Sequence, residues 1–142
     1  MPLPNPEPGL VISYAYLWQA EHEQGQEEGL KDRPCAIVLS TCDDDGNTVV
    51  TVVPVTHTPP KYPNEAIEIP AATKQRLGLD HERSWVVVKE VNRFVWPGPD
   101  LRPVVGGSPD RFDYGFVPPA LFRKIKKLLL DYATRQVVAR TV

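Results

Sequence analysis

The chain has 142 residues, which is enough for one domain that buries about two-thirds of its unfolded surface without disulfides or metals. Its formal charge of −2 provides no global attraction for nucleic acid, so a polyanion would need a local cluster of cations. Two cysteines are too few for a disulfide framework, and no apolar run approaches the roughly 20 residues of a membrane span. We therefore expect a soluble protein in a reducing, cytoplasmic setting.

The N-terminal half predicts an extended lead-in followed by three strands. Residues 1–8 are rich in proline and predict a polyproline-like segment, and the β-branched and aromatic run 10–18 predicts a strand. The acidic, glycine-containing segment 19–32 predicts a loop. Residues 35–40 and 48–55 predict a hairpin at the centre of the sheet, because the Asp-Gly-Asn between them is a strong turn signal.

The next part of the chain alternates short elements with a proline-rich loop. The prolines of 57–64 predict a surface loop, and the alternation in 66–69 predicts a short strand. Residues 70–79 predict one or two helical turns, with Pro70 at the start and Gly78 past the end. Residues 84–96 are apolar at both ends and polar in the middle, which predicts two strands or one bent strand.

A long loop and a helix complete the predicted domain. Residues 97–118 are dense in Pro and Gly and predict one long loop. Residues 119–139 predict a C-terminal helix, because apolar side chains recur at helical spacing, namely Leu121, Phe122, Ile125, Leu128, Leu129 and Tyr132. The predicted fold is one mainly β domain with a C-terminal helix, built as a small, strongly curved sheet or a partly open barrel.

Motifs for metals, nucleotides and serine hydrolysis are not evident in the sequence. The histidines His22, His57 and His81 are scattered, and the two cysteines do not have metal-ligand spacing. A Walker-type phosphate loop is lacking, and no serine lies in a strand-turn-helix elbow. We expect neither a metal site nor a cofactor.

Polar residues gather at the ends of the predicted strands. Arg33 precedes one strand of the hairpin, and Thr56 follows the other. Counting outward from Asp45 and Gly46 pairs position 34 with about position 57, so we expect Arg33 and Thr56 to be near neighbours at one end of the sheet. A guanidinium beside hydroxyls is a suitable binding site for a phosphodiester. The alternative is that these polar residues have a structural role and cap solvated strand ends. The other candidate residues are His57, Thr58, Lys89, Glu90, Asn92 and Arg93.

Ordered motifs over residues 8–96 resemble a known family. The segments are PGLVISYAYLW, HEQ, KDRPCAIVLS, VVTVVPVTHTPP and KEVNRFVW. In this order they resemble the motifs of the MazF/PemK (Kid-like) toxins of type II toxin-antitoxin systems. The resemblance implies an SH3-like β-barrel of the MazF/PemK/CcdB-like plasmid maintenance toxin fold, a C-terminal helix and a homodimer.

The same resemblance implies a metal-independent, sequence-selective endoribonuclease that cleaves single-stranded mRNA and is neutralised by a cognate antitoxin. In this family the 2′-hydroxyl attacks the adjacent phosphate, which leaves a 2′,3′-cyclic phosphate and a 5′-hydroxyl. The family's catalytic Arg and Thr correspond to Arg33 and Thr56. Arg33 would neutralise the phosphorane charge and could protonate the leaving oxygen, and Thr56 would hydrogen-bond a non-bridging oxygen.

The chain departs from the family pattern at the general base. Lys89 and Glu90 stand where some members carry an acidic residue and Gln, so Glu90 or His57 would have to act as the base. His22 matches the loop histidine of Kid-like members. Because of these departures, a second hypothesis is that the protein is a non-catalytic interaction module of the same fold, comparable to the CcdB-type topoisomerase inhibitors. A third hypothesis is that the protein is a general RNA-binding barrel that stacks bases on Trp85, Phe94 or Trp96.

Overall fold

The structure is a computed structural model that describes residues 3–18, 31–104 and 106–141. Within these residues it contains strands and helices in the order β1 (Leu10–Tyr14), β2 (Arg33–Cys42), β3 (Thr48–Thr56), β4 (Ala66–Glu68), α2 (Ala71–Leu77), β5 (Trp85–Val87), β6 (Asn92–Val95), β7 (Asp113–Phe116) and α3 (Pro119–Thr141). The predicted class, mainly β with a C-terminal helix, is confirmed. In the described part of the chain, no helix is both long and apolar enough to cross a membrane.

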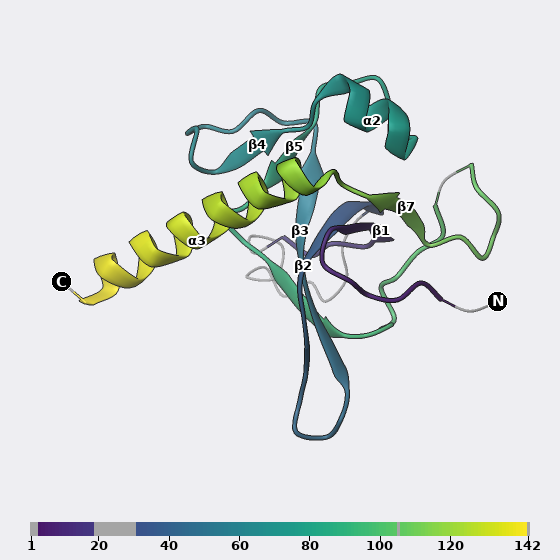
Figure 1. Ribbon diagram of the computed structural model, residues 1–142, viewed down its shortest axis with the longest axis horizontal. Helices are drawn as coiled ribbons and strands as arrows, with labels where there is room; N and C mark the ends of the chain where they lie inside the picture. Colours follow the sequence, from purple (N-terminus) through teal and green to yellow (C-terminus); the bar gives the residue numbers. More distant parts are fainter. Residues whose placement is uncertain (1–2, 19–30, 105, 142) are drawn as a thin grey trace.

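The strands form one antiparallel sheet whose order is β4-β5-β3-β2-β1-β7, with β6 also paired to β3. The central β2–β3 hairpin projects from the body of the molecule (Figure 1). Strands β4 and β7 lie at the two ends of the path, and no pairing between described residues joins them. Within the described residues, the sheet is therefore not closed into a barrel by strand pairing.

The register of the central hairpin determines which residues meet at its open end. Pairing runs from Cys42 opposite Thr48 to Cys35 opposite Pro54, with an irregularity between Ile37 and Leu39. Simple counting from the turn misses the register by two residues, because the loop and this bulge are not visible in the sequence. Extended by two residues toward the open end, the observed register sets Arg33 level with Thr56.

Alternating residues of the central strands form two hydrophobic clusters, one on each face of the sheet. The cluster that α2 and α3 cover includes Val11, Ala36, Val53, Leu77, Leu121 and Ile125. The opposite cluster, against which Phe94 and Trp96 pack, includes Ile12, Tyr14, Tyr16, Cys35, Ile37 and Val52. Burial on both faces explains why these strands are almost continuously apolar in sequence.

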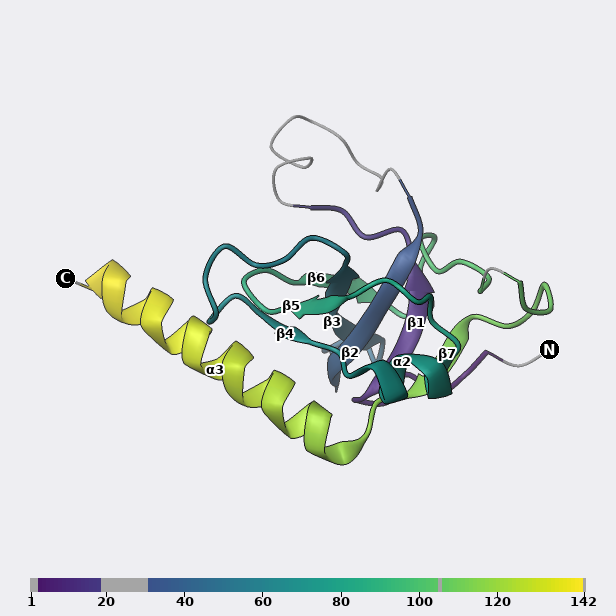
Figure 2. The same cartoon turned by 90° about the horizontal axis from the view of Figure 1, so that it is seen from above.

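The C-terminal helix packs one stripe of side chains on the sheet. Leu121 and Ile125 are buried, and Phe122, Leu128 and Leu129 pack partly buried against the same cluster. Figure 2 shows α3 running along one side of the sheet, with its C-terminal part extending past β4 and β5. The predicted helix 119–139 is confirmed and continues to Thr141.

The prediction of one unbroken loop over 97–118 is wrong. Strand β7 lies inside this segment and pairs with β1, and Leu101 forms an isolated bridge with Tyr14. The segment gives the edge of β1 the backbone partners that a buried strand needs. The surrounding prolines and glycines hid this short strand from sequence analysis. The first predicted strand is also shorter than expected and ends at Tyr14.

Two shorter predictions are confirmed. The short helix α2 follows Pro70 and ends at Gly78, whose φ of 73° is the left-handed conformation that favours glycine. The segment 84–96 forms two strands, β5 and β6, which pair with different parts of β3. Because β5 pairs with the last residues of β3, the turn that precedes β5 lies beside the open end of the hairpin.

Tyr16 predicts a loss of stability in alkaline solution. Its side chain is 1% exposed, and its hydroxyl donates to Glu90 Oε1 at 3.3 Å. Burial, followed by the nearby Glu90 charge, raises the pKa of Tyr16 above its ordinary value. Because the pKa of Tyr16 is higher in the folded state, the neutral side chain stabilises the fold. This stabilisation is fully present below the unfolded pKa of about 10 and is lost as the pH rises above it.

We therefore expect the free energy of unfolding of the wild type to fall more steeply with pH than that of Tyr16→Phe. One tyrosine contributes at most about 1.4 kcal/mol per pH unit above about pH 10. Urea denaturation between about pH 8 and 11 measures both slopes. Equal slopes in the two proteins would contradict the expected ionisation of Tyr16 on unfolding.

Candidate functional site

A cavity of about 900 Å³ lies where β2 begins and β3 ends. Its walls come from these two strand ends, from the loop after β3, and from the turn that joins α2 to β5. The cavity brings together five residues that the sequence proposed for the site, namely Arg33, Thr56, His57, Thr58 and Lys89.

Arg33 occupies the first position of β2 and contributes its guanidinium to this cavity. Its Nη1 donates to the carbonyl of Val55 at 3.4 Å, and the guanidinium carbon lies 5.0 Å from the centre of the Trp18 ring. Its Nε is buried and has no hydrogen-bond partner among the described residues. A guanidinium is a forked, charged donor that suits an anionic ligand, and Arg33 brings one to the wall of the cavity.

Thr56 occupies the last position of β3, on the strand next to Arg33. Its Oγ1 accepts a hydrogen bond from the backbone N–H of Thr58 at 3.2 Å. This bond orients the oxygen and leaves the hydroxyl proton available to donate. Arg33 and Thr56 together therefore present a charged donor and a neutral donor from adjacent strand ends.

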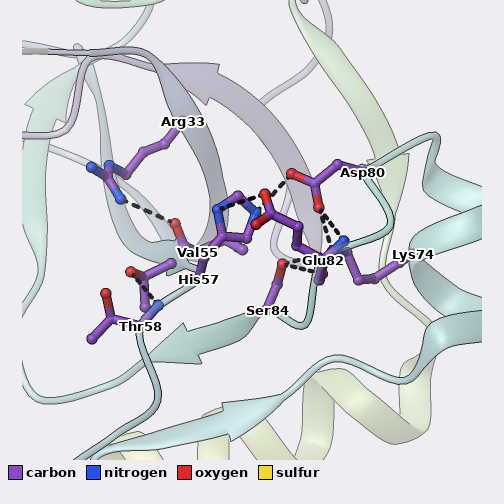
Figure 3. A network of polar contacts seen from close by, with 9 residues as sticks. Arg33, Val55, His57, Thr58, Lys74, Asp80, Glu82 and Ser84 are labelled. Atoms are coloured by element: carbon purple, nitrogen blue, oxygen red, sulfur yellow. Dashed lines mark hydrogen bonds and ion pairs between the residues drawn. The ribbon is translucent and has the colours of Figure 1, made fainter.

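His57 lies beside two carboxylates of the turn before β5 (Figure 3). Its Nε2 is 2.7 Å from Asp80 Oδ2, and its Nδ1 is 3.6 Å from Glu82 Oε2. The ligand atoms of these three exposed residues lie within 4.8 Å of one another. The two carboxylates contact opposite nitrogens of the ring, however, and a single ion binds only one of these nitrogens. The arrangement therefore fits a hydrogen bond between the imidazole and Asp80, with Glu82 as a nearby charge, better than shared coordination of one metal.

Charged side chains make the cavity less acidic than the chain as a whole. Lys89 pairs with Glu65 at 3.5 Å, and Asp32 lies 3.6 Å from Arg102. Among the described residues that line the cavity, the cations are Lys31, Arg33, Lys61 and Lys89, and the carboxylates are Asp32, Glu65 and Asp80. This local balance is compatible with a polyanion even though the formal charge of the chain is −2.

The remaining described candidates line a separate cavity of about 530 Å³, which shares Lys89 with the first. There the Asn92 side chain accepts from the backbone N–H of Leu17 and donates to the Leu17 carbonyl, both at 2.9 Å. Asn92 thus holds the chain that follows β1, which is a structural role. Glu90 accepts the Tyr16 hydrogen bond, and Arg93 is exposed on β6. His22 lies outside the described residues.

The aromatic residues considered as stacking platforms for bases lie in the packed part of the protein. Trp85 is 7% exposed, and Phe94 stacks on Tyr14 with 4.6 Å between ring centroids. Trp96 is half-buried and lies 6.1 Å from Phe94. These contacts favour a core role for the three residues.

Sequence analysis missed the residues that surround His57. Asp80 and Glu82 are 23 and 25 positions away from it, and Lys74, which contacts Asp80, belongs to α2. Pairing of β3 with β5 brings them together. The one local signal was the charged segment DHER, which begins three residues after the last residue of α2.

No protein-family model matches the chain, and a search of curated proteins found no match.

Proposed function

We propose that the protein is a metal-independent endoribonuclease of the MazF/PemK toxin type that cleaves single-stranded RNA. The observation that carries this proposal is the cavity in which the guanidinium of Arg33 and the oriented hydroxyl of Thr56 come from adjacent strand ends. The ordered motifs around both residues support the same assignment.

The proposed reaction is an internal transfer of the phosphodiester. The ribose 2′-hydroxyl loses its proton and attacks phosphorus, the bond from phosphorus to the 5′-oxygen breaks, and a 2′,3′-cyclic phosphate forms. Negative charge grows on the non-bridging oxygens in the transition state. The positively charged guanidinium of Arg33 neutralises this charge, and Thr56 donates to one of the same oxygens.

The same proposal includes the fold, the oligomeric state, the cellular location and the protein partner. The curved sheet with its C-terminal helix corresponds to an opened SH3-like barrel. The active unit is a homodimer in the cytoplasm, and a cognate antitoxin protein binds the toxin and prevents RNA from entering the cavity.

The chemistry of the product ends tests the reaction. Incubation with single-stranded RNA is expected to give downstream fragments with 5′-hydroxyl ends that polynucleotide kinase can label, and upstream fragments whose 3′ ends carry a 2′,3′-cyclic phosphate. An RNA with a 2′-deoxyribose at the cut residue is expected to resist cleavage. Products with 5′-phosphates, or cleavage of the deoxy-substituted RNA, would contradict attack by the 2′-hydroxyl.

Thr56→Val tests the proposed neutral donor. The substitution keeps the shape of the side chain and removes the hydroxyl, so we expect the kcat for RNA cleavage to fall about 10²-fold to 10³-fold. Thr41→Val is the matched control, because Thr41 is exposed near the far end of the hairpin. Unchanged cleavage by the folded Thr56→Val variant would remove Thr56 from the site.

A further inference from the structure

The side chain of His57 is held in one orientation by a chain of buried and half-exposed polar contacts. Asp80 accepts from Lys74 and from the backbone N–H of Glu82 through Oδ1, at 2.7 and 3.2 Å. Its second oxygen, Oδ2, is left for His57 Nε2 at 2.7 Å. The carboxylate of Asp80 is thus fixed on one side and directed at the imidazole on the other.

Lys74 anchors this arrangement from within the protein. Its side chain is 6% exposed, and its ammonium group donates to Asp80, to the Ser84 hydroxyl at 2.7 Å, and to the Glu82 carbonyl. Three acceptors satisfy all three protons of the ammonium group, so the buried charge is fully paired. The turn that carries Asp80 is therefore tied to α2, and Figure 3 shows the resulting line from Lys74 through Asp80 to His57.

The protonation of Asp80 determines which nitrogen of His57 carries the proton. Burial raises the pKa of Asp80, but the hydrogen bonds and charges of Lys74 and His57 outweigh it and lower this pKa below its ordinary value. Asp80 is therefore ionised and accepts a proton from Nε2, which leaves the lone pair of a neutral imidazole on Nδ1. The contact between Nδ1 and Glu82 is 3.6 Å, which is too long for a hydrogen bond.

We propose that His57, oriented by Asp80 and Lys74, is the general base that takes the proton of the ribose 2′-hydroxyl. This inference rests on the proposed function. The proton moves from the 2′-oxygen to Nδ1, the bond from this oxygen to phosphorus forms, and the bond to the 5′-oxygen breaks. The 5′-oxygen takes a proton from water, and the imidazolium later returns its proton to solvent.

The charges around the ring are suited to this role. Asp80 and Glu82 approach the two ring nitrogens, so both carboxylates stabilise the imidazolium once it forms, as in other acid-base dyads. Arg33, Lys89 and Glu65 line the same cavity from β2 and from the segments that flank β4 and β5. His57 directly follows Thr56 in the chain, so base and phosphate donor are attached to neighbouring backbone positions.

The test compares His57→Gln and Asp80→Asn with His81→Gln, a matched control at an exposed histidine outside the cavity lining. General-base loss typically lowers rates by about 10²-fold to 10⁴-fold, so His57→Gln should lose at least about 10²-fold in kcat. The acidic limb of its pH-rate profile should disappear. Asp80→Asn should lower kcat more than it changes KM and should shift this limb. His81→Gln should match the wild type.

Nitrogen NMR of the histidine rings supplies a readout that does not depend on cleavage. The expected state of His57 near neutral pH has its proton on Nε2 when the ring is neutral, and Asp80→Asn should weaken this preference. A proton on Nδ1 would overturn the inference. RNA cleavage by His57→Gln with the wild-type rate and acidic limb would overturn the role of His57 and leave the ribonuclease intact. If the folded wild type cleaves no RNA, the proposed function itself fails, and the base role fails with it.

Discussion

Arg33→Ala is expected to reduce RNA cleavage by at least about 10²-fold to 10³-fold while the protein stays folded. The substitution removes the cation that the proposed reaction places against the phosphorane. Among the described residues, the Arg33 side chain donates one long hydrogen bond, to the Val55 carbonyl at 3.4 Å, and contacts the Trp18 ring, so we expect only a small loss of stability. Cleavage of one RNA by the wild type and by Arg33→Ala measures the loss of activity. Thermal unfolding of the same two proteins shows whether the variant stays folded.

Two further variants sharpen the interpretation of this result. Arg33→Lys keeps the charge but loses the planar fork of donors, so we expect it to recover only part of the activity. Arg76→Ala is the matched control, because Arg76 is exposed on α2 and lies outside the cavity lining. If folded Arg33→Ala cleaves RNA as fast as Arg76→Ala does, Arg33 is not part of the site.

Ile125→Ala is expected to cause the largest loss of stability among simple truncations of α3. Ile125 is completely buried in the cluster between the helix and the sheet. Truncation of such a side chain to Ala typically costs about 2 to 5 kcal/mol, from lost burial and from the cavity that remains. Urea denaturation of the two proteins measures the difference in the free energy of unfolding.

Leu130→Ala provides the matched comparison on the same helix. Leu130 is 57% exposed, so its truncation should change the free energy of unfolding by less than about 0.5 kcal/mol. Equal effects of the two substitutions would mean that α3 does not pack on the sheet through Ile125.

The parts of the fold that sequence could predict depend on local patterns. The hairpin is specified by its turn residues and by two apolar runs, and this was sufficient to bring Arg33 near Thr56, although the register was wrong by two residues. The C-terminal helix is specified by the spacing of its apolar residues, and α2 by Pro70 and Gly78. In each case the signal lies within a few positions of the element that it predicts.

The parts that sequence could not predict depend on distant contacts. Strand β7 was hidden by Pro and Gly, and only its pairing with β1 makes it a strand. Asp80 reaches His57 because β5 pairs with β3, and no local pattern indicated this pairing. Asn92 was proposed for the site because it is polar, but its side-chain amide forms hydrogen bonds with the backbone of Leu17.

The central claim is tested most directly by incubating the purified wild-type protein with a long single-stranded RNA in the presence of EDTA and mapping the new 5′ ends. The proposed function predicts cleavage at a short recurring sequence that EDTA does not reduce. Intact RNA after incubation with folded protein that is free of antitoxin would contradict it. That result would favour a non-catalytic interaction module built on the same fold.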